Sequence, residues 1–267
     1  MNFRERLKRG DRLIGTLLTL DAPAVAEILS RAGYDWLFLD LEHSAMGPIE
    51  AQRMLQAVGE RIPTLVRVES RDEVGIRKAL DIGAAGIIVP QIHSRAEAET
   101  AVRLAKYPPA GSRGVGLGRA TLFGNHFADY LARANRETAV VVQIEHVDAV
   151  ADIGAIAAVE GVDALFVGPY DLSASMGLPG KVAAPEVTDA IAKVLATTRS
   201  AHIAAGIFAA GASAAKDYMA QGFSLIAMGT DGLLLGQGAA SELRLLDEES
   251  LSEDPTDCTG PMGGIHR

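Results

Sequence analysis

Short apolar segments and amphipathic segments alternate along this chain, and this alternation restricts the fold more than any other feature. The apolar segments have the length and the Val, Ile and Leu content of strands buried on both faces. We expect strands at Leu13–Leu20, Asp35–Asp40, Thr64–Val68, Gly86–Pro90, Ala139–Glu145, Ala164–Val167, Ile203–Phe208 and Ser224–Met228. We expect amphipathic helices between them, for example at Pro23–Ala32, Pro48–Val58, Val74–Ile82, Arg95–Lys106, Val147–Val159, Pro185–Arg199 and Ala212–Gln221. Eight strand–helix units in about 245 residues predict an α/β fold of the (β/α)8 TIM-barrel type.

The main alternative is a doubly wound open sheet. That fold would place a Gly-x-Gly-x-x-Gly loop after the first strand, and none is present there. The nearest candidate, Gly111–Gly116, follows no strand and leads into no immediate helix. The barrel is therefore the favoured prediction, and a dinucleotide site is disfavoured.

Two regions depart from the alternation. Lys106–Asn135 contains Pro108-Pro109 and a loop rich in Gly and Arg, which is typical of a lid or of a contact between subunits. Residues 247–267 are acidic and rich in Ser, Pro and Gly, so they lack the apolar side chains of a core. We expect one catalytic barrel over residues 1–246 and an exposed extension over 247–267.

Composition argues against several classes of function. The net charge is −9 and no basic stripe is present, which disfavours nucleic-acid binding. The one cysteine, Cys258, excludes an intramolecular disulfide and fits a reducing cytoplasm. No run reaches the roughly 18 apolar residues of a membrane span, and no apolar segment follows the charged N-terminus, so neither a span nor a signal peptide is expected.

Polar residues end several expected strands, at the carboxyl edge where TIM barrels carry their functional groups. They are Asp40, Glu42 and His43 after the second strand, Arg67 and Glu69 after the third, Gln143 and Glu145 after the fifth, and Asp171 after the sixth. An unpaired carboxylate costs several kcal/mol to desolvate. Glu145 and Asp171 on neighbouring strands therefore predict a shared Mg²⁺ or Mn²⁺, ions that prefer oxygen ligands. The alternative is that each caps a helix or pairs with an arginine.

Arg67 lies among β-branched residues and must find an anion, because its charge cannot be removed. Asp40 or Glu42 is one candidate partner, and an anionic substrate oxygen is another. His43 follows two acidic residues and is a candidate general base. His146 adjoins Glu145 but is expected to point elsewhere if the strand continues.

The remaining ionisable and nucleophilic residues suggest no second site. We expect no functional cluster around His93, His126, His202 or His266. No lysine ends an expected strand, which disfavours a Schiff-base aldolase. No Gly-x-Ser-x-Gly segment is present, and Cys258 lies near the C-terminus, so acyl-enzyme chemistry has no candidate nucleophile.

Five segments together resemble the HpcH/HpaI family of class II pyruvate aldolases, in the branch that acts on 4-hydroxy-2-oxoheptanedioate and 2-keto-3-deoxy sugar acids. They are Asp40–Ser44, Val66–Val68, Gly111–Gly116, Gln143–Glu145 and Gly168–Gly177, in the family's order and with compatible spacing. The resemblance spans about residues 3–246. Glu69, where several relatives carry proline or a small polar residue, departs from it and leaves substrate preference open.

The resemblance implies a barrel of the phosphoenolpyruvate/pyruvate type, with its last helix exchanged between subunits of a homo-hexamer built from dimers. It implies that Glu145 and Asp171 bind Mg²⁺, Mn²⁺ or Co²⁺, and that Arg67 contacts the keto oxygen of pyruvate. His43 would act in acid–base chemistry, with Asp40 or Glu42 orienting it, and Asp81 would reach a neighbouring subunit's site. Gln143, Gly168, Pro169 and backbone amides around Ser173 are the further substrate-binding candidates.

The function expected from these residues is metal-dependent, reversible cleavage of a 4-hydroxy-2-oxo acid into pyruvate, or a close 2-oxo acid, and a small aldehyde through an enolate. One alternative is a related carbon–carbon lyase, either a 2-oxo acid decarboxylase or a lyase of citryl thioesters. Another is a non-catalytic barrel used for binding. The sequence leaves open which aldehyde is accepted, which metal is used and which pathway is served.

Overall fold

The computed structural model describes residues 1–252, with the backbone alone for 247–252. Eight parallel strands form a closed barrel in which each strand pairs with the next and β8 returns to β1. They are β1 (Leu13–Leu18), β2 (Trp36–Asp40), β3 (Thr64–Arg67), β4 (Gly86–Val89), β5 (Ala139–Ile144), β6 (Ala164–Val167), β7 (Ala204–Ala209) and β8 (Leu225–Thr230). The predicted TIM barrel is confirmed.

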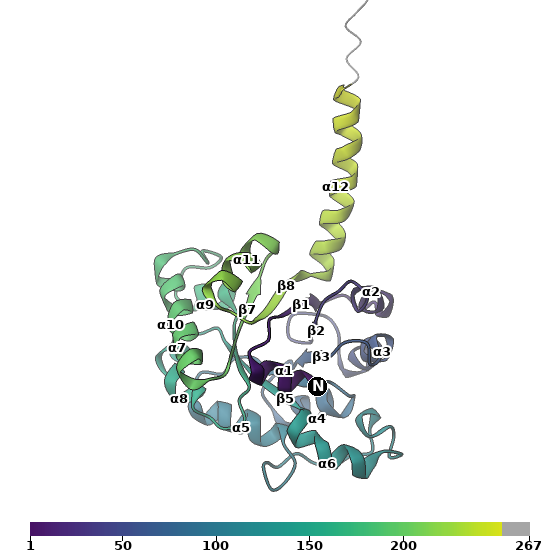
Figure 1. Cartoon of the computed structure of the whole chain (residues 1–267), viewed down its shortest axis with the longest axis vertical. Helices are drawn as coiled ribbons and strands as arrows, with labels where there is room; N and C mark the ends of the chain where they lie inside the picture. Colours follow the sequence, from purple (N-terminus) through teal and green to yellow (C-terminus); the bar gives the residue numbers. More distant parts are fainter. Residues whose placement is uncertain (253–267) are drawn as a thin grey trace, which may run out of the picture. The chain divides into compact units, whose positions relative to one another are not determined.

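Helices surround the strands (Figure 1). They are α2 (Pro23–Leu29), α3 (Pro48–Val58), α4 (Glu73–Asp81), α5 (Arg95–Ala105), α6 (Phe127–Glu137), α7 (Val147–Ala151), α8 (Ile153–Ala157), α9 (Pro169–Ser175), α10 (Pro185–Ala201) and α11 (Ala212–Gln221). A further helix, α1 (Phe3–Arg9), precedes β1, and α12 (Asp231–Ser252) follows β8. The single helix expected over 147–159 is wrong, because the chain breaks at Asp152, whose carboxylate accepts a hydrogen bond from the Arg95 amide at 2.8 Å.

The insert over 106–135 is more regular than expected. It contains a short 3₁₀ helix, Arg119–Thr121, and most of α6. Lys106 anchors its start, since the buried ammonium donates to the carbonyls of Asn135 and Thr138 at 3.1 and 2.6 Å. The insert is therefore held against the start of β5.

Two layers of apolar side chains form the core. Inside the barrel, the rings of Trp36 and Phe38 stack with centroids 5.8 Å apart, and Phe166 meets Phe38 edge-on at 5.6 Å. Phe3 and Leu7 of α1 join this inner cluster, so α1 contributes to the core inside the barrel. The outer layer packs strand residues such as Leu37 and Leu39 against the helices.

The chain divides by compactness into Met1–Asp231 and the segment from Gly232 onward. The second part begins with α12, whose leucines at 233–235, 243, 245 and 246 are exposed. The domain boundary expected at 246/247 therefore falls inside α12, while Cys258 and most of the expected extension lie outside the described residues. Within residues 1–252, no helix is both long and apolar enough to cross a membrane.

Candidate active site at the barrel mouth

The two-residue repeat of the strands decides which side chains enter the barrel mouth. Trp36 and Phe38 point into the barrel, so Asp40 on the same face does as well. Leu65 places Arg67 inside in the same way, and Val141 places Gln143 and then Glu145. The last inward-facing side chain of each of these strands therefore lies at the barrel mouth.

Asp40 and Arg67 form a buried, bidentate ion pair. They are directly opposite each other in the β2–β3 register. Arg67 Nε and Nη2 donate to the two Asp40 carboxylate oxygens at 2.8 and 2.7 Å, and the side chains are 1% and 8% exposed. Arg67 also lies over the Phe38 ring, 5.2 Å from its centroid. Of the partners considered for Arg67, Asp40 is the one that fixes its plane.

Gln143 connects Arg67 to Glu145. Its side-chain oxygen accepts from Arg67 Nη1 at 3.3 Å, and its side-chain nitrogen donates to Glu145 Oε2. The other Glu145 oxygen accepts from the Gln91 amide at 2.8 Å. Burial raises the pKa of Glu145, and the nearby charge of Asp171 adds to the rise, while these hydrogen bonds and Arg67 oppose it.

Glu42 and His43 follow β2 at the edge of the mouth. Asp40 Oδ1 accepts from the backbone amides of both residues, at 3.0 and 3.3 Å, which fixes the turn. Glu42 Oε2 lies 3.2 Å from Arg67 Nη1 and 3.8 Å from His43 Nε2, yet among the described residues it has no hydrogen-bond partner. Burial raises the pKa of Glu42 to about 7, although the charge of Arg67 opposes the rise.

Asp171 lies in the first turn of α9, a helix that starts with Pro169 directly after β6. Gly168 passes so close to the network that an added Cβ would lie 3.1 Å from Glu145 Oε2 and 3.2 Å from Gln143 Nε2. Ser173 is buried, and its hydroxyl donates to the Tyr170 carbonyl and accepts from the Gly180 amide. Its side chain therefore stabilises the α9 loop.

A cavity of about 240 Å³ opens at this mouth. Seven predicted site residues line it: Asp40, His43, Arg67, Gln143, Gly168, Pro169 and Asp171. Leu17, Phe38, Phe166 and Phe208 supply its apolar wall. Glu42 and Glu145 are not among its lining residues and adjoin it through Arg67 and Gln143. The cavity is small, mostly apolar and has one cationic anchor, which suits a small organic anion.

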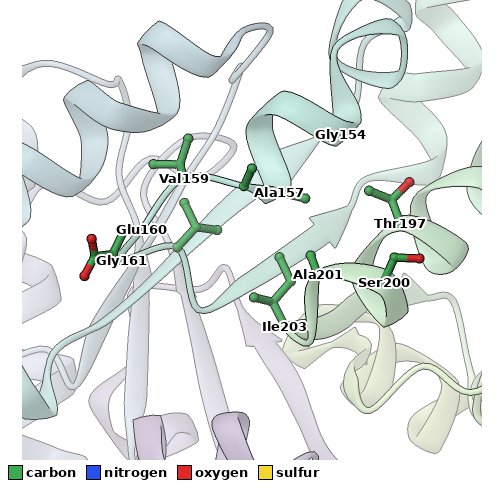
Figure 2. A pocket seen from close by; sticks show the side chains of 11 residues that line it. Gly154, Ala157, Val159, Glu160, Gly161, Thr197, Ser200, Ala201 and Ile203 are labelled. Carbon is green, nitrogen blue, oxygen red and sulfur yellow. The ribbon is translucent and has the colours of Figure 1, made fainter.

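A larger cavity of about 530 Å³ lies near the amino ends of β6 and β7 and offers less chemistry. Its wall consists mainly of small aliphatic residues of α8, α10 and the loops before the two strands (Figure 2). The Glu160 carboxylate lies on the opposite side from the hydroxyls of Thr197 and Ser200 (Figure 2). The mouth, which gathers several charged groups, is therefore the candidate active site.

Asp81 is not at the mouth of its own chain. It ends α4, just before β4 begins, and so lies at the opposite end of the barrel. Its carboxylate accepts from Arg113 Nη2 at 2.7 Å, and Arg113 lies 4.5 Å from the centroid of the Tyr107 ring. The structure thus joins Asp81 to the insert.

The sequence prediction missed two features of this face. The expectation of no cluster around His93 is wrong, because its ring stacks on His146 with centroids 4.5 Å apart. Asp231 is buried and accepts from the Thr19 amide and hydroxyl at 3.0 and 2.7 Å. Spacing in the sequence reveals neither contact, since the first depends on the pairing of β4 with β5 and the second on the pairing of β8 with β1.

The charge balance of the mouth fits a divalent cation. Asp40, Glu42, Glu145 and Asp171 supply four carboxylates, and the arginine among them, Arg67, pairs with Asp40 and lies 3.2 Å from Glu42. Burial raises the pKa of both Glu42 and Glu145, although the charge of Arg67 opposes the rise in each case. Glu42 also presents a buried oxygen without a hydrogen bond among the described residues. Oxygen donors of this kind are those preferred by Mg²⁺ and Mn²⁺.

Comparison with known proteins places the chain among aldolases and lyases. The family model described as HpcH/HpaI aldolase/citrate lyase matches residues 13–237. A hydroxypyruvate/pyruvate aldolase of Pseudomonas aeruginosa is 41% identical over 239 residues, which are 87% of this chain and 88% of the relative. A 4-hydroxy-2-oxo-heptane-1,7-dioate aldolase of Salmonella dublin is 40% identical over 255 residues, 94% of this chain and 96% of the relative. The crystal structure of an HpcH/HpaI aldolase/citrate lyase family protein from Burkholderia cenocepacia superposes with a TM-score of 0.88 at 38% identity, covering 91% of this chain and 98% of that one.

Proposed function

Because this chain belongs to the HpcH/HpaI aldolase/citrate lyase family, we propose that its barrel mouth performs metal-dependent cleavage of a 4-hydroxy-2-oxo acid. The chain is a carbon–carbon lyase of the pyruvate aldolase type, as its relatives at about 40% identity are named. The products are pyruvate, or a close 2-oxo acid, and a small aldehyde. The observation that carries the proposal is the network from Asp40 through Arg67 and Gln143 to Glu145, which adjoins a cavity of about 240 Å³.

Glu145 and Asp171 are the residues that would hold a divalent cation. When bound, the ion supplies Lewis-acid stabilisation of the negative charge that develops on the substrate during cleavage. Glu145 is suited to this role because Gln91 and Gln143 fix both of its oxygens from the protein side. The choice among Mg²⁺, Mn²⁺ and Co²⁺ belongs to this proposal.

Arg67 binds the 2-oxo acid and stabilises the enolate. Asp40 holds the guanidinium plane on one edge, which leaves the Nη1 edge to face Glu42, Gln143 and the cavity. Donors that are fixed before the reaction need no reorganisation as negative charge appears, and removal of one such donor typically costs about 10²–10³ in kcat. The adjacent rings of Phe38 and Phe166 give the cavity an apolar wall.

His43 takes the proton from the C4 hydroxyl group as the carbon–carbon bond breaks. Asp40 fixes its backbone, and Glu42 Oε2 lies 3.8 Å from its Nε2. Glu42, with a pKa near 7, can hold or release a proton beside His43 at neutral pH. Gly168 and Pro169 line the cavity and would contact the substrate there.

The active form is a homo-oligomer, a hexamer built from dimers. Two apolar surfaces support this: the leucines of α12 and the insert residues Val115, Leu117, Leu122 and Phe123, all exposed in the single chain. Asp81 and Arg113 pair at the base of that insert. In the assembly we expect α12 to be exchanged and Asp81 to approach the site of a neighbouring subunit.

The test is pyruvate release from a panel of 4-hydroxy-2-oxo acids, coupled to lactate dehydrogenase. We expect turnover that EDTA abolishes and Mg²⁺, Mn²⁺ or Co²⁺ restores, and a loss of at least about 10²-fold in Arg67→Ala with metal binding retained. Arg4→Ala is the matched control, since Arg4 also holds a buried carboxylate, Asp163 at 2.8 Å, but at the opposite end of the barrel. Arg4→Ala should lower stability and leave kcat unchanged.

Two outcomes would contradict the proposal. Unchanged turnover in Arg67→Ala would exclude its role in charge stabilisation. Release of CO₂ from 2-oxo acids, or cleavage of a citryl thioester, without aldehyde formation would assign the mouth to a related lyase reaction.

A further inference from the structure

We propose that His93, His146 and Asp148 form a second cation site, on the rim of the barrel outside β4 and β5. Each residue offers one ligand atom, and these atoms lie within 4.8 Å of one another. The occupant we infer is a transition-metal ion that favours imidazole, with Zn²⁺ as the reference case. This site does not depend on the proposed aldolase chemistry, because none of its three residues lines the mouth cavity.

The barrel brings the three residues together. β4 and β5 are adjacent and in register, with Val89 opposite Val142. After β4 the chain turns at Gln91, whose φ of 54° is unusual for a residue other than glycine, and reaches His93 just before α5. After β5, His146 is the N-cap of α7, and Asp148 lies in the first turn of that helix. Both imidazoles thus stand at neighbouring strand–helix junctions.

The two imidazole rings are already face to face. Their centroids are 4.5 Å apart and their planes differ by 23°. His146 Nδ1 accepts a hydrogen bond from the Asp148 amide at 3.2 Å, so its lone pair faces Asp148. The Asp148 carboxylate Oδ2 lies 3.3 Å from the same nitrogen. A bound ion would replace the weak local hydrogen bond with two stronger interactions.

The separation of His146 and Asp148 fits a tetrahedral ion, while His93 has to move to join them. Two ligands about 2.0–2.1 Å from Zn²⁺ are roughly 3.3 Å apart in tetrahedral geometry. His146 and Asp148 already have this separation at 3.3 Å. The half-buried His93 ring has to rotate out of its stack on His146 to close the remaining gap, since the lone pairs of stacked rings do not converge on one ion. Three protein ligands and one water complete a common Zn²⁺ coordination.

The donor set distinguishes this site from the mouth. Glu145 and Asp171 offer oxygen alone, which suits Mg²⁺ and Mn²⁺, whereas two imidazoles and one carboxylate favour Zn²⁺, Cu²⁺, Ni²⁺ or Co²⁺. The two sites are nevertheless linked by one residue. The Gln91 amide donates to Glu145 at 2.8 Å, and the Gln91 side-chain oxygen lies 3.3 Å from His93 Nε2.

The experiment is calorimetric titration of the full-length, tag-free protein with Zn²⁺ in saturating Mg²⁺, which occupies oxygen-only sites. Wild type, His93→Gln, Asp148→Asn and His126→Gln are compared, with circular dichroism to check folding. His126→Gln is the matched control, because His126 lies 3.8 Å from Asp129 in an exposed His–Asp pair. Cys258 and His266 are present in all four proteins, so differences report the cluster.

We expect one Zn²⁺ per chain in wild type and His126→Gln that Mg²⁺ does not displace. Loss of a residue that only hydrogen-bonds a metal ligand costs about 10–100-fold in affinity, so His93→Gln and Asp148→Asn should each weaken this binding at least about tenfold. X-ray absorption of the zinc-loaded wild type should show two imidazoles per ion. Equal affinity in wild type and His93→Gln, displacement of Zn²⁺ by Mg²⁺, or an equal loss in His126→Gln would each overturn the proposal. Aldolase turnover enters none of these measurements, so a failure here leaves the proposed function untouched.

Discussion

The buried pair of Asp40 and Arg67 gives a quantitative prediction about stability. Both side chains are at most 8% exposed and share two hydrogen bonds of 2.8 and 2.7 Å. Arg67→Met removes the cation and leaves Asp40 as an uncompensated buried charge, which costs about 3–5 kcal/mol. The double variant Asp40→Asn/Arg67→Met removes both charges, and replacement of a whole buried pair is often close to neutral. We therefore expect the double variant to be at least about 2 kcal/mol more stable than Arg67→Met alone.

Thermal unfolding followed by circular dichroism measures this difference. For a protein of this size 1 kcal/mol shifts Tm by about 2–4 °C, so Arg67→Met should unfold roughly 6–20 °C below wild type. Arg77→Met is the control, since Arg77 pairs at 3.0 Å with the exposed Glu73 and should change stability by at most about 0.5 kcal/mol. The single variant Asp40→Asn completes the cycle, and a loss in the double variant equal to the sum of the losses in Arg67→Met and Asp40→Asn would refute the reasoning. A double variant that is folded but inactive would also show that the Asp40–Arg67 pair acts in catalysis and not only in folding.

Three further predictions concern the mouth and its support. Glu42 has a pKa of about 7 in the folded protein against 4.5 ordinarily, so the unfolded chain releases this proton at lower pH than the folded protein does. The free energy of unfolding of the metal-free wild type should therefore fall by at most about 3 kcal/mol as pH rises from about 4.5 to 7. Glu42→Gln should flatten this part of the Tm profile, and a flat wild-type profile in EDTA would contradict the prediction. Asp231→Ala removes the acceptor of the Thr19 amide, the Thr19 hydroxyl and the Leu20 amide, and it should lower the free energy of unfolding in urea by about 2–4 kcal/mol. Hydrogen exchange of the two amides should become faster, and unchanged exchange would refute the prediction. Gly168→Ala places a methyl group 3.1 Å from Glu145 Oε2 and should lower kcat at least about tenfold with little loss of Tm. Gly154→Ala is the control, because its Cβ would meet nothing within 4 Å, and it should match wild type in the coupled pyruvate assay. A normal rate in Gly168→Ala would show that the network tolerates displacement.

The helices that the sequence prediction missed had local signals of different strength. Asn2 and Glu5 form a capping box at the start of α1, a pattern that is visible in the sequence. α6 begins at His126 without a side-chain cap, so only its amphipathic spacing could have indicated it. At the break between α7 and α8, Asp152 accepts a hydrogen bond from the Arg95 amide, a contact that no local pattern reveals.

For the site residues too, the sequence indicated which groups are present, and the tertiary structure decided which of them are in contact. Arg67 was expected to pair with Asp40 or Glu42, and the β2–β3 register decides for Asp40 in a bidentate pair, with Glu42 at 3.2 Å. Ser173 was a candidate at the mouth, yet the α9 loop turns its hydroxyl toward Tyr170 and Gly180. His93 and His146 are far apart in sequence, and their stack depends on the turn at Gln91.

The sequence by itself determined the barrel and the chemical groups at its mouth. Alternating segments fix the number of strands, and the two-residue repeat carries Asp40, Arg67 and Gln143 to the inner face, because both effects act along one stretch of chain. Only the tertiary structure decided which of these groups touch, which lack a partner and which loops meet at the rim. Those outcomes depend on register between strands and on backbone turns outside them, and packing of the whole molecule sets both.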